Sequence, residues 1–292
     1  MSSQRAGPVN PAFRGGISFL GTDAQSFYNS LLLTADTRLT RALSLRFNYT
    51  FAKSVDDASS IPTSANQQYG LARTLDRGVS DFDLRQRVSI NYFYNLPSFK
   101  AQSGFLSRTL STALGSWRLG GIMSFRTGTP TTLKISVRRA GYLFSAARPN
   151  LRPGQSNNPT SGVSIGCNDP ITGALVTPAG EKLGTTDLTF DRCAFNVPEP
   201  GTLGNVGRNT MFGPSALSMD MSLQRDFSLG NNRRLQFRAE MFNVANHTNF
   251  RTSTQSGVTV FTGPGRYSTQ SGHYFDTATT SRQIQFALRL SF

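Results

Sequence analysis

The chain has 292 residues, a mass of 31.8 kDa and a formal net charge of +14. No run of apolar residues exceeds three, which excludes a transmembrane helix, because such a helix needs about 20 apolar residues. The 22 phenylalanines and a charged fraction of only 16% argue against simple disorder. Two cysteines are too few for a disulfide scaffold or a four-cysteine zinc site.

Arginine supplies almost all of the positive charge, and it is spread along the whole chain. Nucleic-acid binders usually concentrate basic residues in a tail or on one helix face, and this chain has no run of five like charges. We therefore expect no nucleic-acid partner. The charge predicts solvated arginines on a large polar surface or, alternatively, a pore or surface that attracts anions.

Alternation of apolar and polar residues with a period of two is the dominant pattern, and it recurs in seven segments. It is clearest at the end of the chain, where Ile284, Phe286 and Leu288 alternate with Gln283, Gln285 and Ala287. Side chains alternate across a β-strand, so each segment predicts one apolar and one polar face. The predicted strands lie near residues 26–39, 41–54, 82–96, 116–128, 214–227, 232–246 and 281–292.

Strand and connector lengths favour a membrane barrel over a soluble sandwich. Strands in globular proteins are usually about 5–6 residues long, whereas strands that span a bilayer need about 9–11. Connectors 39–41 and 228–232 are short, and 97–115 is of medium length with a short helix expected at 106–114. Connectors 55–81, 129–213 and 249–280 are long and rich in residues that break regular structure.

Short turns on one side and long loops on the other are typical of outer-membrane barrels. The predicted fold class is therefore all-β: an antiparallel transmembrane β-barrel segment of about seven long strands, with short periplasmic turns and long extracellular loops. The predicted location is the outer membrane of a Gram-negative bacterium.

Charged residues in the strands fall mostly on the polar face, which we expect to line the lumen. A lipid-facing arginine at the bilayer midplane would cost about 2–4 kcal/mol. Only Arg225 and Arg282 fall on the apolar face, near strand ends, where a long side chain is expected to reach water. The lumen-facing candidates are Arg38, Arg46, Arg85, Arg87, Arg118, Arg126, Asp220, Arg238, Glu240 and Arg289.

These arginines admit two interpretations. They can guide an anionic substrate, because a charged cleft focuses the electric field. They can also pair with carboxylates on neighbouring strands, which is the interpretation favoured for most of them. The candidate partners are Asp36, Asp220, Asp226 and Glu240.

The long loops carry three further sets of candidate residues. Cys167 and Cys193 are expected to form a disulfide in an oxidising compartment, with two free thiols as the alternative. Five aspartates in or beside 55–81 are expected to balance nearby arginines, with a calcium site as the alternative. The aspartates are Asp56, Asp57, Asp76, Asp81 and Asp83, and the arginines are Arg73, Arg77 and Arg85. Contact with lipopolysaccharide phosphates is a hypothesis for Arg138, Arg139, Arg148 and Arg152.

No catalytic constellation stands out. The one Gly-x-Ser-x-Gly match, centred on Ser164, has loop-like sequence on both sides, whereas a nucleophile elbow needs a strand before it and a helix after it. Two histidines leave little metal or general-base chemistry. We expect no enzyme activity, no metal and no cofactor.

The odd strand count suggests a larger barrel. Bacterial single-chain barrels have an even number of strands, and unpaired strand edges are not stable in lipid. We therefore expect residues 1–25 to be a loop remnant or partial strand, and 26–292 to be the C-terminal portion of a longer barrel without its plug domain. This would also explain why the first residues do not form a signal peptide.

Six segments together resemble the TonB-dependent outer-membrane receptors, in their Oar-like branch. They are RLTRALSLRFNYTFAKSVDD (38–57), DFDLRQRVSINYFYNLP (81–97), GSWRLGGIMSFRTGTP (115–130), NVGRNTMFGPSALSMDMSLQRDF (205–227), RLQFRAEMFNVANHTNF (234–250) and the final QIQFALRLSF. The resemblance implies a barrel of about 22 strands, plugged by an N-terminal domain. It implies uptake of a scarce nutrient of the siderophore, oligosaccharide or peptide class, driven through TonB.

The resemblance also implies partners. Phe292 resembles the family's terminal signal for the barrel-assembly machinery, and TonB would act through the missing N-terminal part. Outer-membrane lipid, lipopolysaccharide and an unidentified small ligand complete the expected partners. Two other functions stay open: a cell-surface adhesion or structural β-protein, and a passive porin.

Overall fold

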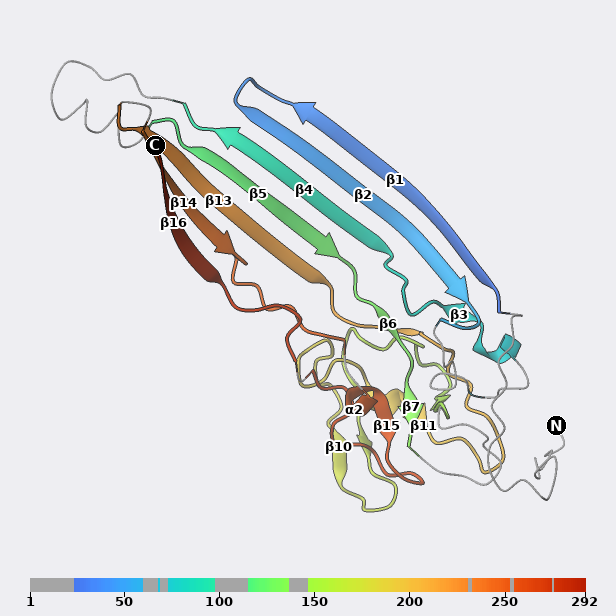
Figure 1. Cartoon of the computed structure of the whole chain (residues 1–292). Helices are drawn as coiled ribbons and strands as arrows, with labels where there is room; N and C mark the ends of the chain where they lie inside the picture. Colours follow the sequence, from blue (N-terminus) through green and yellow to red (C-terminus); the bar gives the residue numbers. More distant parts are fainter. Residues whose placement is uncertain are drawn as a thin grey trace, which may run out of the picture.

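The computed structural model describes residues 24–59, 68, 73–97, 115–136, 147–230, 233–252, 255–274 and 276–292. Seven long strands form one antiparallel sheet in which neighbours in space are also neighbours in sequence (Figure 1). The strands are β1 (Ser26–Arg38), β2 (Leu43–Asp56), β4 (Gln86–Asn95), β5 (Arg118–Arg126), β13 (Ala216–Ser228), β14 (Arg234–Phe242) and β16 (Gln283–Ser291). A short strand, β3 (Gly78–Val79), also pairs with β2. The seven predicted strands are confirmed, with ends shifted by a few residues.

The register of the sheet keeps like faces together. Leu31 lies opposite Phe51, Leu223 opposite Leu119, and Phe237 opposite Leu288. On the other face Asp36 lies opposite Arg46, Ser89 opposite Ser124, and Gln236 opposite Arg289. A slip of one residue would exchange the two faces of a strand, so this register extends one apolar and one polar wall across the sheet.

Short connections lie at one end of the sheet, together with the C-terminus, and the long connectors gather at the other end (Figure 1). We call these the turn end and the loop end. At the turn end the Thr40 hydroxyl accepts hydrogen bonds from the backbone N–H groups of Ala42 and Leu43. Gly230, with a φ of +77°, allows the chain to reverse between β13 and β14. The helix expected at 106–114 lies outside the described residues.

Strand β14 ends earlier than expected, because the chain turns at Asn243. Asn243 and Asn246 both have a φ of +49°, a left-handed conformation that asparagine tolerates better than most residues. The Asn243 side chain is buried and donates hydrogen bonds to the carbonyls of His247 and Thr280. The segment predicted as a strand to residue 246 therefore ends in a hydrogen-bonded turn after Phe242.

The described parts of the long connectors 129–213 and 249–280 fold together into a body with its own hydrophobic core, which we call the loop body. Its core contains Leu133, Ile135, Ala147, Phe190, Ala194, Phe195, Val206, Met211, Val258, Val260, Phe261 and Tyr267. These apolar residues are irregularly spaced in sequence and therefore carry no period-two signal. The described parts of these connectors have mostly irregular backbone, as their composition indicates, but no sequence pattern indicated their packed core.

Short strands of two or three residues pair with one another and connect the segments of the loop body. The pairs are β6 (Pro130–Thr131) with β12 (Met211–Phe212), β7 (Lys134–Ile135) with β15 (Thr259–Phe261), β8 (Asn150–Leu151) with β11 (Phe195–Asn196), and β9 (Cys167–Asn168) with β10 (Leu175–Thr177). The described helices are single turns: η2 (Arg73–Asp76), η3 (Arg192–Ala194) and α2 (Gln255–Val258). Frequent glycine and proline limit the length of each element without preventing a packed core.

Candidate functional site

Three ion pairs join neighbouring residues on the polar face of the sheet. Arg46 pairs with Asp36, Arg118 with Asp226, and Arg238 with Glu240. Two glutamines extend the last two pairs: Gln236 donates to Asp226 over 2.8 Å and Gln285 donates to Glu240 over 2.6 Å. The Arg46 and Asp36 side chains are 60% and 58% exposed, so this pair contributes at most about 1 kcal/mol to stability.

The other lumen-facing candidates have different surroundings. Arg87 and Arg126 are direct cross-strand neighbours near the loop end of β4 and β5. Within the described residues, neither they nor Arg38 and Arg289 form an ion pair. Like charges placed directly opposite each other are destabilising, so Arg87 and Arg126 form a local excess of positive charge.

Two lumen-facing candidates, Arg85 and Asp220, contact residues near the ends of the strands and not charged residues on neighbouring strands. Arg85 precedes β4 and pairs with Asp83 over 3.3 Å. Asp220 accepts a hydrogen bond of 2.9 Å from the backbone N–H of Asn243, which holds the turn after β14.

Phe292, the expected barrel-assembly signal, follows β16 at the turn end and is 95% exposed.

Arg225 does not reach water as expected from the sequence. It lies on the apolar face but is only 6% exposed, and its guanidinium sits 5.7 Å from the Trp117 ring and 4.7 Å from the Phe227 ring. Phe227 is two residues further along the same strand face, so the period-two geometry brings the two side chains together. The contact is a cation–π interaction, which stabilises a buried guanidinium near the strand end.

A disulfide crosses the loop body. Cys167 on β9 is bonded to Cys193 on η3, with a Cα–Cα distance of 5.5 Å. Asp191 caps the N-terminus of η3 and accepts hydrogen bonds from the Cys193 backbone N–H and the Ser164 hydroxyl. Ser164 is 2% exposed, and this hydrogen bond makes it an anchor for the loop around the disulfide.

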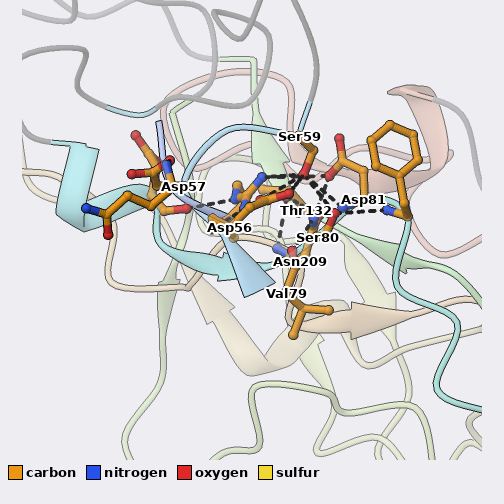
Figure 2. Close-up of polar contacts among 12 residues, drawn as sticks. Asp56, Asp57, Ser59, Val79, Ser80, Asp81, Thr132 and Asn209 are labelled. Atoms are coloured by element: carbon orange, nitrogen blue, oxygen red, sulfur yellow. Dashed lines mark hydrogen bonds and ion pairs between the residues drawn. The ribbon is translucent and has the colours of Figure 1, made fainter. Parts of the chain in front are cut away.

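A buried polar cluster joins the loop body to the rim of the sheet, and Figure 2 labels several of its residues, among them Asp56, Asp81 and Asn209. Arg208 of the loop body makes most of the contacts in this cluster, and its side chain is 2% exposed. Its guanidinium pairs with the Asp56 carboxylate and donates to the Asp56 carbonyl over 2.6 Å, the Ser59 hydroxyl over 2.9 Å and the Asp76 carbonyl over 2.7 Å. The Asp81 carboxylate lies 4.0 Å from the same guanidinium.

Asn209 forms the second half of this cluster. Its side-chain amide donates to the Val79 carbonyl over 2.8 Å and to the Asp81 carboxylate, and its carbonyl oxygen accepts from the Thr132 hydroxyl (Figure 2). Its φ of +55° again favours asparagine. Two consecutive residues of the loop body thus bind both β3 and the end of β2.

A second buried ion pair joins Arg148 to Asp76, with side chains 1% and 0% exposed. Among the described side chains, the aspartates therefore pair mainly with arginines distant in sequence. The Asp83–Arg85 pair matches the expectation, and Arg77 forms no ion pair with a described aspartate. The side chain of Arg73 lies outside the described residues. No sequence signal indicated Arg208 or Asn209. Within the described residues, no three side chains of His, Cys, Asp or Glu are arranged to hold a metal ion.

These contacts also change the expected set of lipopolysaccharide contacts. Arg148 is buried and therefore unavailable for that role. Arg152 donates to Asn196 over 2.8 Å and to the Tyr267 hydroxyl over 3.3 Å. Arg138 and Arg139 lie outside the described residues.

Burial and hydrogen bonding shift several pKa values in the loop body. Burial lowers the pKa of Arg148 and of Lys134, although the nearby carboxylates Asp76 and Asp81 respectively act in the opposite direction. Backbone N–H groups, that of Thr172 first, lower the pKa of the Asp169 carboxyl. Burial raises the pKa of Tyr274 to about 12, so this phenol stays neutral at physiological pH.

The described part of the chain contains no helix that is long and apolar enough to cross a membrane. No curated protein and no solved structure matches the chain. A family model described as an outer membrane beta barrel domain matches residues 2–285, nearly the whole sequence. The chain therefore belongs to the outer membrane beta barrel domain family, and it is a protein of the bacterial outer membrane.

Proposed function

We propose that the chain is the C-terminal barrel portion of a TonB-dependent receptor that takes up a scarce nutrient across the outer membrane. The observation that carries the proposal is the loop body, a packed and cross-linked structure at the loop end of a sheet with one polar wall. In outer-membrane barrels the long loops face the outside. A ligand approaching from outside would therefore meet an ordered surface before it reached the polar wall.

This arrangement supports selective uptake more than passive diffusion. A porin needs an open aqueous passage, whereas a receptor needs a defined surface that recognises its ligand. Buried ion pairs from Arg148 and Arg208 fix the loop body to the rim, and a disulfide fixes its interior. Preorganised groups bind with a smaller entropic cost, which suits a nutrient present at low concentration.

The polar wall adds a pathway with suitable chemistry. Most of its charges are neutralised in pairs, while Arg87 and Arg126 leave an excess of positive charge near the loop end. Such a pair would attract a ligand that carries a negative group toward the lumen. A surface adhesin would have no use for an apolar wall that faces lipid along seven long strands.

The test compares a deletion of the gene that encodes the chain with a deletion of tonB in the same strain. Both strains are grown on limiting ferric siderophore, oligosaccharide or peptide as the only source of iron or carbon. We expect both deletions to abolish growth on the same nutrient, and a protonophore to stop its uptake in the parent strain. Uptake that persists with the protonophore and rises linearly with concentration would instead identify a passive pore.

A further inference from the structure

A polar groove lies in the loop body, and Arg208 is not among its lining residues. It has a volume of about 520 Å³, within the range of roughly 300–1,000 Å³ that accommodates small organic ligands. Four asparagines from four separate segments line it: Asn150 on β8, Asn168 on β9, Asn196 on β11 and Asn205 in the following loop. The fold therefore brings four amides from separate segments to one groove.

Hydrogen bonds fix the orientation of three of these amides. The carbonyl oxygen of Asn150 accepts from the Asn205 backbone N–H over 2.9 Å, and that of Asn205 accepts from the Leu151 backbone N–H over 2.7 Å. The carbonyl oxygen of Asn196 accepts from the Arg152 guanidinium over 2.8 Å. Within the described residues the three NH₂ groups have no hydrogen-bond partner, so they remain available as donors on the groove wall.

Acceptors and a rigid floor complete the lining. Asn168 is exposed and offers an amide oxygen as well as an NH₂ group, while Glu199 offers a carboxylate. Tyr267 lies beneath, with its hydroxyl donating to the Phe195 carbonyl over 3.2 Å and accepting from Arg152. Burial raises the pKa of Tyr267, so its hydroxyl keeps the proton that this hydrogen bond needs.

The charge of the groove argues against an anionic ligand. Among the described residues that line it, the ionisable side chains are Arg152, Glu199 and the neutral Tyr267, and the charges of Arg152 and Glu199 cancel. This balance is local, because the chain as a whole carries +14. A ligand that suits the groove needs many hydrogen-bonding groups, each able to donate or accept, and no net charge.

We propose that this groove is a binding site for a neutral carbohydrate, whose hydroxyl groups pair with the four asparagine amides and the Glu199 carboxylate. Each sugar hydroxyl is both donor and acceptor, which matches a wall of amide NH₂ groups with interspersed acceptors. Binding itself does not depend on TonB. Only the role of the groove in nutrient uptake rests on the proposed function.

The test measures binding to the full chain, folded in detergent micelles, by isothermal titration calorimetry. The probes are neutral tetrasaccharides of α-linked glucose, β-linked glucose, β-linked xylose and β-linked galactose, with inorganic phosphate as the anionic comparison. We expect at least one tetrasaccharide to bind and phosphate not to bind. Absence of binding by all four sugars, or preferred binding of phosphate or of a neutral peptide, would overturn the proposal.

Two groove variants locate the site. Asn168→Trp fills the groove at an exposed residue whose side chain makes no hydrogen bond within the described chain, and Asn196→Ala removes one amide. Each should weaken binding at least tenfold. Asn157→Ala is the matched control, because Asn157 is an exposed asparagine of the same body outside the groove. Unchanged binding in Asn168→Trp would refute the site.

The two proposals fail separately. Loss of sugar binding in the groove variants, without any growth defect in the gene deletion, would support the carbohydrate site and contradict nutrient uptake. A TonB-dependent growth defect with normal sugar binding by Asn168→Trp would support nutrient uptake and contradict the carbohydrate site.

Discussion

Replacing Arg208 with alanine should release the loop body from the rim of the sheet. The substitution removes the buried ion pair with Asp56 and the hydrogen bonds to Ser59 and to the carbonyls of Asp56 and Asp76. The Asp56 carboxylate would stay buried, with only the Ser59 hydroxyl as a remaining donor from the described cluster. Removing one partner of a buried ion pair costs about 3–5 kcal/mol, because the other charge is left without compensation.

That cost predicts a large change in local opening. Since about 1.4 kcal/mol corresponds to a factor of ten, the open population of the loop body should rise by roughly two to three and a half orders of magnitude. Hydrogen exchange of backbone amides in 147–213, followed by mass spectrometry in outer-membrane preparations, measures this rise. The amides of β13 and β14 should exchange as in the parent protein, since the sheet makes its own ladder of hydrogen bonds.

The control is Arg266→Ala, which removes an exposed arginine from the same loop body. A surface substitution of this kind usually changes stability by less than about 0.5 kcal/mol. Exchange in Arg208→Ala that stays within tenfold of the control would refute the view that this cluster holds the loop body in place.

Three further outcomes follow from the sheet and the loop body. Leu223→Arg, on the apolar face, should destabilise folding into lipid vesicles by about 2–4 kcal/mol in urea titrations, whereas its polar-face neighbour Ser222→Arg should not. Replacing Cys167 and Cys193 with serine should cost the loop body roughly 3–4 kcal/mol, which faster cleavage by external protease would reveal. Burial raises the pKa of Tyr274 to about 12 from about 10 in an unfolded chain, so its stabilising contribution is present below pH 10. That contribution is lost as the pH rises from 10 towards 12; phenolate absorbance should follow this loss, and Tyr274→Phe should remove it.

The sheet was predictable because strand periodicity is a local signal. Alternation in 217–223 or 284–290 is visible within one segment, and the antiparallel order follows from connecting consecutive strands. Errors arose where local sequence has two interpretations. The strand predicted to reach residue 246 ends at Phe242, where the chain turns at Asn243. Arg225 resembled a side chain that reaches water, because its aromatic neighbour Trp117 is distant in sequence.

The loop body was not predictable in the same way. Its core and its ion pairs depend on contacts between residues far apart in sequence, such as Arg208 with Asp56 and Arg148 with Asp76. Frequent glycine and proline indicated irregular backbone correctly, but irregular backbone is compatible with a packed core. The groove asparagines carry no spacing pattern, and only the folded chain brings them together.

Single-cysteine labelling along β13 in native outer membranes tests directly whether the sheet separates lipid from a polar lumen. Cysteines are introduced one at a time at residues 217–224, in a chain whose own two cysteines are already joined in a disulfide. We expect odd positions to react with a lipid-soluble maleimide and even positions with a water-soluble one. Equal reaction of both faces with the water-soluble reagent would contradict a wall that separates lipid from a polar lumen.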